Sequence, residues 1–154
     1  MEISIGNFAD SRVKALLEYH LRGMHENSPP GHVFALDWSS LQKPEITFWT
    51  GYAAADLVVM GALKALGDGA GEIKSMRVGQ GQAGKGYGAA MLTHIIAEAK
   101  ARNYRRLSLE TGSTPAFEPA INLYRSFGFE EGEAFAGYAK TEFNRMFHLR
   151  LSKS

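Results

Sequence analysis

A glycine-rich segment is the part of this sequence whose residue types and spacing point most directly to chemistry. Five of the ten residues from Gly79 to Gly88 are glycines, and they connect a predicted strand to a predicted helix. Glycines permit tight turns that direct several backbone N–H groups at one anion, and the helix N-terminus adds partial positive charge. The segment is therefore predicted to bind a phosphate-containing ligand. A flexible connector without a ligand is the structural alternative.

The dinucleotide fingerprint is one pattern that this segment matches. Gly79, Gly81 and Gly84 have its spacing, and Glu110 ends the next predicted strand, where a ribose-binding acid would lie. A dinucleotide-binding domain needs a series of parallel strands, however, and only 44 residues follow Glu110. The length of the chain argues against this pattern.

Two other patterns start from the same glycines. Gly79, Gly84 and Lys85 match a P-loop, but Gly86 occupies the position of the Ser or Thr that binds Mg²⁺. Without that metal ligand, phosphoryl transfer loses its main electrostatic element. The remaining pattern is Gly84, Gly86 and Gly88 at the start of the helix, which suits the diphosphate of coenzyme A.

Hydrophobic periodicity predicts the elements that hold this segment. The predicted strands are 2–8, 45–52, 56–65, 71–78, 106–110, one from Phe129 onward, and 145–151. The predicted helices are one capped by Asp10 or Ser11, a short turn at 36–41, one ending near Arg102, and one from Pro119 to the αL stop at Gly128. This order predicts a mixed α/β (α+β) fold with one central sheet, in a single domain spanning residues 1–154.

Composition excludes several classes of function. The 154 residues include no cysteine, which excludes disulfide scaffolds, thiolate metal sites and cysteine nucleophiles. The formal net charge of +1 provides no general attraction to nucleic acid or to anionic membranes. The longest apolar run, Leu57–Leu63, is too short to span a bilayer, and the first residues lack the pattern of a secretory signal. The sequence therefore predicts a cytoplasmic protein without a nucleic-acid or membrane partner.

Three segments resemble the GNAT superfamily of acyl-CoA-dependent N-acyltransferases, in its order and at its spacing. They are Glu72–Val78, Gly84–Gly88 and Ala120–Phe129, and Pro44–Trp49 and Leu107–Ser113 are similar to a bacterial branch of acetyltransferases. The resemblance covers nearly the whole chain. It implies a sheet of about six to seven strands flanked by about four helices. It also implies transfer of the acetyl group of acetyl-CoA to a primary amine of a small molecule or peptide, by direct attack in a ternary complex.

The resemblance assigns CoA to the glycine segment and to the strand before it, which splays from its neighbour in this family. The implied contacts are Met76, Arg77, Val78, Gln82, Ala83, Gly84, Lys85, Gly86, Tyr87 and Gly88. Met76 and Val78 provide the main backbone contacts. Strict strand alternation places Glu72, Lys74, Met76 and Val78 on one face and Ile73, Ser75 and Arg77 on the other.

Two residues match the family's acid and base. Glu72 is implied to act as general base, often through water, and Tyr124 as the general acid that protonates the leaving thiolate. Each has a structural alternative. Glu72 could be a solvated or ion-paired acid near a strand end, and Tyr124 could be a core aromatic in line with Ala120 and Phe127.

The sequence departs from the family pattern at two positions. Ala83 stands where the glycine loop usually begins with Arg or Gln, and Gln82 lies one residue earlier. Phe117 stands where the family often has Asn. Neither change removes a backbone N–H donor, so we expect them to alter the affinity for CoA rather than the fold.

Other features leave the function less defined. The five histidines show no spacing typical of metal ligands, so no metal is predicted. A non-catalytic acyl-CoA-binding sensor or regulatory module is the alternative to an enzyme, and a nucleotide-binding enzyme is the third option. The identity of the amine acceptor is not encoded in a transferable pattern. The resemblance leaves a homodimer open.

Overall fold

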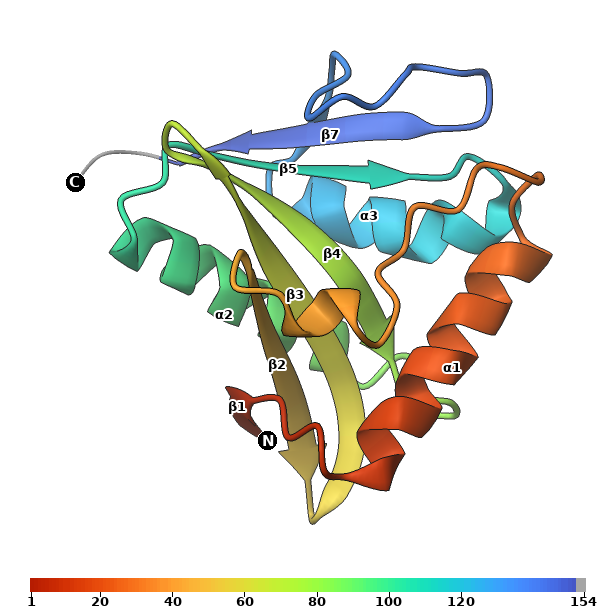
Figure 1. Ribbon diagram of the computed structural model, residues 1–154, viewed down its shortest axis with the longest axis vertical. Helices are drawn as coiled ribbons and strands as arrows, with labels where there is room; N and C mark the ends of the chain where they lie inside the picture. The colour runs from red at the N-terminus through yellow and green to blue at the C-terminus, as the bar shows by residue number, and fades with distance from the viewer. Residues whose placement is uncertain (152–154) are drawn as a thin grey trace.

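The computed structural model describes residues 1–151, which form seven strands and three α-helices (Figure 1). The strands make one sheet in the order β1-β2-β3-β4-β5-β7-β6. Their bounds are β1 Glu2–Ile5, β2 Ile46–Ala53, β3 Asp56–Gly67, β4 Ala70–Val78, β5 Arg106–Thr111, β6 Glu130–Glu131 and β7 Arg145–Arg150. Strands β1 to β4 are antiparallel neighbours, whereas β4 and β5 are parallel. The sheet is therefore mixed. Its one parallel pairing within residues 1–151 joins the first residues of β4 and β5, and the glycine segment follows the other end of β4.

Local sequence signals set the ends of the helices. Helix α1 spans Ser11–Glu26, and the Asp10 side chain caps it by accepting the N–H of Arg12 at 2.9 Å. Helix α2, Tyr87–Ala101, starts at the end of the glycine segment, and α3 spans Glu118–Ser126. Two residues after α3, Gly128 has a φ of +97°, a backbone conformation that favours glycine and ends the helix.

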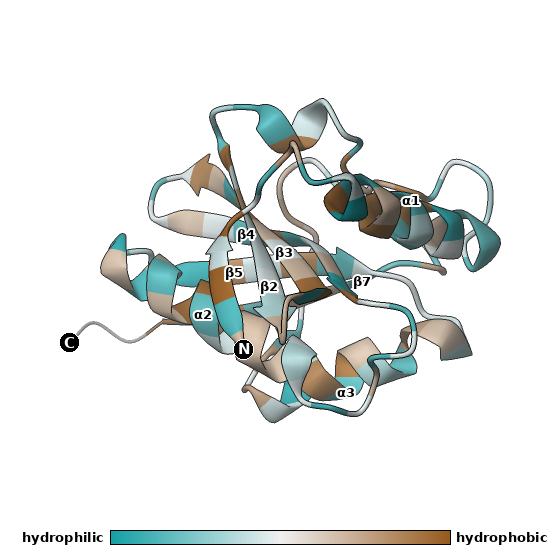
Figure 2. Ribbon diagram, turned by 90° about the horizontal axis from the view of Figure 1, so that it is seen from below, coloured by the Kyte–Doolittle hydropathy of each residue, from teal (hydrophilic) through white to brown (hydrophobic). Residues whose placement is uncertain are grey.

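Helices cover both faces of the sheet, with α1 on one side and α2 and α3 on the other (Figure 2). Alternate residues of β3 supply the two cores. Met60 and Ala62 pack with the apolar face of α1, whereas Val59 and Leu63 pack with α2 and α3. A strand buried on both faces is typical of this kind of layered α/β sheet.

The predicted α/β fold class is confirmed, with some differences in its elements. The short turn predicted at 36–41 is a 3₁₀ turn at Ser40–Gln42, so three α-helices rather than about four flank the sheet. A second 3₁₀ turn, Pro115–Phe117, precedes α3. The first strand is shorter than predicted because pairing with β2 stops at Ile5. Among residues 1–151, none of the helices is both long and apolar enough to cross a membrane.

Candidate active site

A cleft opens where β4 and β5 separate. The two strands pair only between Ala70–Glu72 and Arg106–Ser108, and then they diverge from this common end (Figure 1). A cavity of about 570 Å³ lies at the gap, with walls from α1, β4, the glycine segment, the end of β5 and α3. Because β4 has no partner strand on this side beyond Glu72, its backbone N–H and C=O groups can pair with a ligand there. This agrees with the splaying that the family resemblance implies.

A β-bulge at Ser75 changes the direction of the side chains of β4. Lys74 pairs with Ala62 and Arg77 with Met60, so two residues of β4 stand opposite Gly61 alone. Ser75 has a φ of +57°, and its buried hydroxyl has no hydrogen-bond partner within the described part of the chain. The register therefore shifts by one residue in the middle of the strand.

The bulge makes the predicted alternation of β4 wrong beyond Lys74. Arg77 lies opposite Met60, and its side chain faces α1, as do those of Glu72 and Lys74. Met76 instead contacts the side of the sheet that α2 covers, where its sulfur lies beside Gly61. The strict period of two fails because the bulge inserts one extra residue into the strand.

The glycine segment presents backbone rather than side chains to the cavity. Gly81, Gly84 and Gly86 have φ values of +78°, +79° and +84°, and Gly86 is the N-cap of α2. At the start of α2, the N–H of Ala90 donates the first helical hydrogen bond to the carbonyl oxygen of Gly86. The N–H groups between them belong to the unpaired first turn of a helix, which favours anions.

The predicted CoA contacts divide into two groups. Met76, Arg77, Val78, Ala83, Gly84, Gly86 and Gly88 line the cavity. The side chains of Gln82 and Lys85 instead bind each other, with the Lys85 ammonium donating to the Gln82 amide oxygen at 3.0 Å. These two residues and Tyr87 are not part of the cavity wall. Gln82 therefore does not occupy the place of the side chain that Ala83 lacks.

Tyr124 lies on the α3 wall of the cavity. Its side chain is 7% exposed, and its ring contacts that of Phe129 edge-on, with the centroids 5.7 Å apart. Burial raises the pKa of the Tyr124 phenol, and the charge of Arg77 opposes this shift. The phenol is therefore protonated at neutral pH, as a proton donor must be.

Glu72 is held in a buried network. Its carboxylate accepts hydrogen bonds from the Tyr138 hydroxyl at 2.6 Å and from the Lys74 ammonium at 3.2 Å. The Lys74 ammonium also donates to the Tyr138 oxygen at 2.7 Å. Burial and the neighbouring Glu72 charge raise the pKa of Tyr138. The side chain of Glu72 is only 2% exposed, so the ion pair with Lys74 keeps a buried charge compensated.

Glu110 is a second carboxylate of the cavity, at the end of β5. Burial raises its pKa to about 7, the charge of Glu72 adds to this shift, and the charge of Lys74 opposes it. We call Glu72, Lys74, Glu110 and Tyr138 the charged cluster. A carboxyl group that titrates near neutral pH beside an open cavity is suited to accept a proton.

Sequence reasoning did not identify most of this cluster as functional. In the sequence, Glu110 has only the position of a candidate ribose-binding acid, and no pattern indicates a role for Tyr138. The alternation of Glu72 and Lys74 on one strand face gave a usable signal, because residues two apart on a strand are neighbours. Tyr138 follows β6 in a segment of irregular structure, 66 residues after Glu72, and no local pattern links the two.

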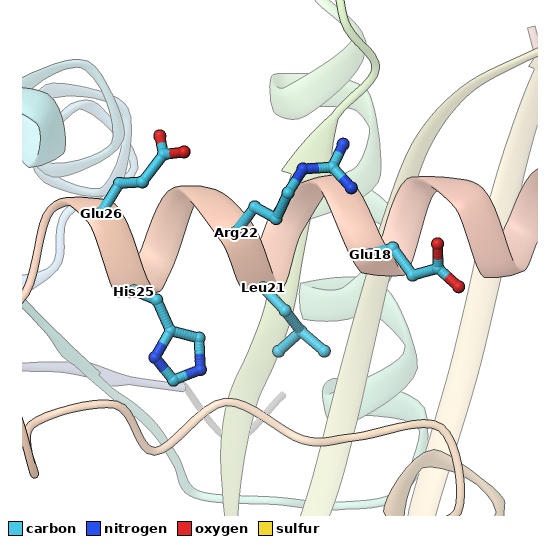
Figure 3. A pocket seen from close by; sticks show the side chains of 5 residues that line it. All are labelled: Glu18, Leu21, Arg22, His25 and Glu26. Atoms are coloured by element: carbon cyan, nitrogen blue, oxygen red, sulfur yellow. The ribbon is translucent and has the colours of Figure 1, made fainter.

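A second hollow lies on the surface of α1, lined by Glu18, Leu21, Arg22, His25 and Glu26 (Figure 3). All five side chains come from successive turns of one helix, and none belongs to the predicted site. Within residues 1–151, no group of three or more His, Asp or Glu side chains is placed to hold a metal ion. The predicted residues Glu72 and Tyr124 line the cavity between β4 and β5 instead.

Known proteins share both the sequence and the fold. The uncharacterized N-acetyltransferase YsnE of Bacillus subtilis (strain 168) is 46% identical over 140 residues, which cover 91% of this chain and 93% of YsnE. A solved protein of Klebsiella pneumoniae has a TM-score of 0.81 at 25% identity, covering 98% of this chain and 97% of the other. A Bacillus subtilis acetyltransferase solved in complex with CoA has a TM-score of 0.73 at 17% identity, covering 98% and 99%.

The family model described as the acetyltransferase (GNAT) family matches residues 13–129. This range contains most of the cavity wall, from α1 through β4 and the glycine segment to Tyr124. With its splayed strands, its glycine-capped helix and this match, the chain belongs to the GNAT family and is an acetyl-CoA-dependent N-acetyltransferase.

Proposed function

We propose that this enzyme acetylates the primary amine of a small molecule or peptide by direct attack on acetyl-CoA in a ternary complex. One observation carries the proposal. A single cavity joins an anion-binding helix start, an unpaired strand edge, a buried phenol and a carboxyl group that titrates near neutral pH. Together these groups match the needs of acyl transfer to an amine.

The residues present fit the diphosphate of CoA at the start of α2. Gly84 and Gly86 have positive φ values, which leave backbone N–H groups free to bind oxygen atoms. A Cβ on Gly88 would lie 3.4 Å from Val78 and from Leu123, so a larger residue would crowd this part of the wall. The unpaired edge of β4 at Met76 and Val78 is then available to the pantetheine chain.

Proton movements complete the reaction. The amine nitrogen forms a bond to the acetyl carbon, and the bond from that carbon to the CoA sulfur breaks. Tyr124 gives its phenolic proton to the departing sulfur, and the second proton that the attacking nitrogen loses as the amide forms returns to the Tyr124 oxygen through solvent. The pKa of Tyr124 is raised by burial, so the phenol holds this proton until the thiolate forms.

The acceptor ammonium must lose its proton before attack. Glu110 is suited to this step because its pKa of about 7 leaves a large carboxylate fraction at neutral pH. Glu72, which the family resemblance implied as the base, is bound to Lys74 and Tyr138. We assign Glu72 the role of fixing these two side chains and of raising the pKa of Glu110 by its charge.

Release of free CoA thiol from acetyl-CoA, measured over a panel of amines, tests the proposal. We expect thiol release that depends on an amine, with the acetylated amine found in equal amount by mass spectrometry. A sensor or regulatory module would bind acetyl-CoA without releasing thiol in the presence of any amine. Omission of the amine is the control for hydrolysis. A protein that binds NAD or ATP in place of acetyl-CoA would contradict the proposal.

A further inference from the structure

Arg77 carries a charge on the α1 wall of the cleft. The bulge at Ser75 directs its side chain toward α1, where Nε donates a hydrogen bond to Nδ1 of His20 at 2.9 Å. The guanidinium also lies over the ring of Tyr19, 5.6 Å from its centroid. The hydrogen bond to His20 holds one edge of the guanidinium, and the Tyr19 ring holds one of its faces.

The charge of Arg77 has no compensating carboxylate nearby. Within residues 1–151, no Asp or Glu oxygen lies within 4.0 Å of its nitrogens. His20 cannot supply a counter-charge, because it is neutral or cationic and never anionic. Burial and the charge of Arg77 lower the pKa of His20 to about 3, so it is a neutral acceptor at physiological pH. Lys74, on the same face of β4, is by contrast paired with Glu72 at 3.2 Å.

The terminal nitrogens of Arg77 are available to a ligand. Only Nε has a hydrogen-bond partner among the bonds of the described residues, and Arg77 is part of the cavity wall. A half-buried guanidinium with its terminal N–H groups free is a receptor for a planar anion, because two parallel N–H groups match the two oxygens of a carboxylate.

We propose that Arg77 binds a carboxylate of the acceptor, so that the substrate is an amino acid or another amine that carries a carboxylate. This inference rests on the proposed function and names its substrate class. A carboxylate fits better than a dianionic phosphate, because the acids Glu72 and Glu110 line the same cavity. Apolar residues Met24, Phe34 and Phe117 complete the wall and suit an apolar substituent.

Arg77 has the diphosphate of CoA as its competing partner, since both ligands are anions. The fold favours the acceptor. Arg77 faces α1, whereas Met76 and Val78 pack toward α2, whose first turn forms the predicted diphosphate site. The guanidinium therefore lies on the side of the sheet opposite to that helix.

Matched pairs of reaction products test this inference without requiring turnover. The probes are the N-acetyl derivatives of glycine, methionine and phenylalanine, each compared with its carboxamide, which keeps the shape and removes the charge. Binding to the CoA-loaded protein is measured by calorimetry. We expect at least one carboxylate to bind about tenfold or more tightly than its amide. Arg77→Gln should remove this difference and leave the affinity for CoA unchanged.

Two further variants make the result specific. Arg77→Lys keeps the charge without the planar fork, so it should retain part of the preference for carboxylates. Arg22→Gln removes an exposed arginine of α1 and should change nothing. Melting temperatures show whether each variant is folded.

Each outcome has a distinct meaning. Equal binding of carboxylates and amides, binding of neither, or a carboxylate preference that survives Arg77→Gln overturns the inference. Weaker CoA binding in Arg77→Gln with unchanged product binding assigns Arg77 to the cofactor and also overturns it. Arg77-dependent carboxylate binding without thiol release from any amine supports the inference and contradicts the proposed function alone.

Discussion

The glycine segment and the charged cluster adjoin the same cleft but are built in different ways. The glycine segment is continuous in sequence and contributes backbone N–H groups, whose directions follow from the positive φ values of Gly84 and Gly86. The charged cluster contributes side chains from β4, β5 and the segment after β6. Glu72, Lys74 and Tyr138 meet through hydrogen bonds of 2.6 to 3.2 Å, and Glu110 interacts with Glu72 and Lys74 through their charges. One region depends on local backbone conformation and the other on tertiary contacts.

This difference predicts how each region responds to substitution. A residue change in the glycine segment alters a local conformation, so its effect should appear in CoA affinity. A change in the charged cluster alters ionisation and partner contacts, so its effect should appear in the dependence of rate and stability on pH. Substitutions at Gly86, Glu110 and Ala83 test that separation, and a substitution at Tyr124, which belongs to neither region, tests the chemical step beside them.

Tyr124→Phe should have the largest effect, on the chemical step. Phe preserves the ring packing against Phe129 and removes only the hydroxyl. General acid assistance contributes roughly 10²–10⁴-fold, so we expect kcat to fall by about that factor. The affinity for acetyl-CoA, measured by calorimetry, and the melting temperature should stay close to the parent values. Tyr104→Phe, outside the cavity wall, is the matched control. A Tyr124→Phe enzyme with the parent kcat would show that the phenol is core packing.

Gly86→Val should weaken CoA binding by roughly 100-fold, or about 2.7 kcal/mol. A β-branched residue at a φ of +84° strains the N-cap of α2 and moves the N–H groups that follow it. Calorimetry with CoA and far-UV circular dichroism check this. Gly67→Val imposes the same strain at a φ of +87° in the β3–β4 turn, at the opposite end of β4 from the glycine segment. That control should lose stability but keep the CoA affinity, and a similar loss of affinity in both variants would refute a local role for Gly86.

Glu110→Gln should change how stability depends on pH. The pKa of Glu110 is raised from 4.5 to about 7 in the folded protein, so the folded state binds this proton more tightly than the unfolded state. Ionisation of Glu110 therefore lowers the stability of the parent protein as pH rises from about 4.5 to 7, and no further above that. The full shift corresponds to about 3.4 kcal/mol, and solvent screening of this partly exposed side chain reduces it, so the variant should gain about 2 kcal/mol relative to the parent over this range, as measured by urea unfolding.

Glu131→Gln provides a control of opposite sign. Hydrogen bonds from Arg145 lower the pKa of Glu131, so its ionised form stabilises the folded state and this contribution is lost as pH falls. That variant should therefore lose stability relative to the parent as pH rises.

The pH dependence of the rate is a second test of Glu110. We expect kcat/KM of the parent to rise toward pH 7, and this rise should disappear in Glu110→Gln but persist in Glu72→Gln. If the rise of kcat/KM toward pH 7 disappeared only in Glu72→Gln, Glu72 would be the general base.

Ala83→Arg should have the smallest effect, a gain in CoA affinity of about fivefold, or about 1 kcal/mol. Ala83 lines the cavity beside Gly84, and the neighbouring Gln82 side chain is bound to Lys85. An arginine here would add a charge-assisted hydrogen bond to the diphosphate. Ala101→Arg adds the same charge at the other end of α2 and should leave the affinity unchanged. Equal affinity of the Ala83→Arg and parent proteins would mean that backbone donors alone suffice.

Much of the fold was predictable because its signals are local. The Asp10 cap, the αL stop at Gly128 and the antiparallel meander of β2 to β4 each depend on residues close in sequence. The glycine segment was predictable for the same reason, since positive φ values are a property of the glycines themselves. The order of these segments then pointed to the family to which the chain belongs.

Only the tertiary structure decided the arrangement of charges in the cleft. The bulge at Ser75 arises from pairing with β3, and it turned Arg77 away from the face that alternation predicted and toward His20. The neighbours of Glu72 include Tyr138, which only the folded chain brings within 2.6 Å. Hydrogen bonds and pKa shifts depend on which groups meet and on how far water is excluded, and neither quantity is encoded in a local pattern of residue types. Sequence alone therefore determined the backbone conformation of the glycine segment. The packing of strands that are distant in sequence determined the contacts and ionisation of the charged cluster.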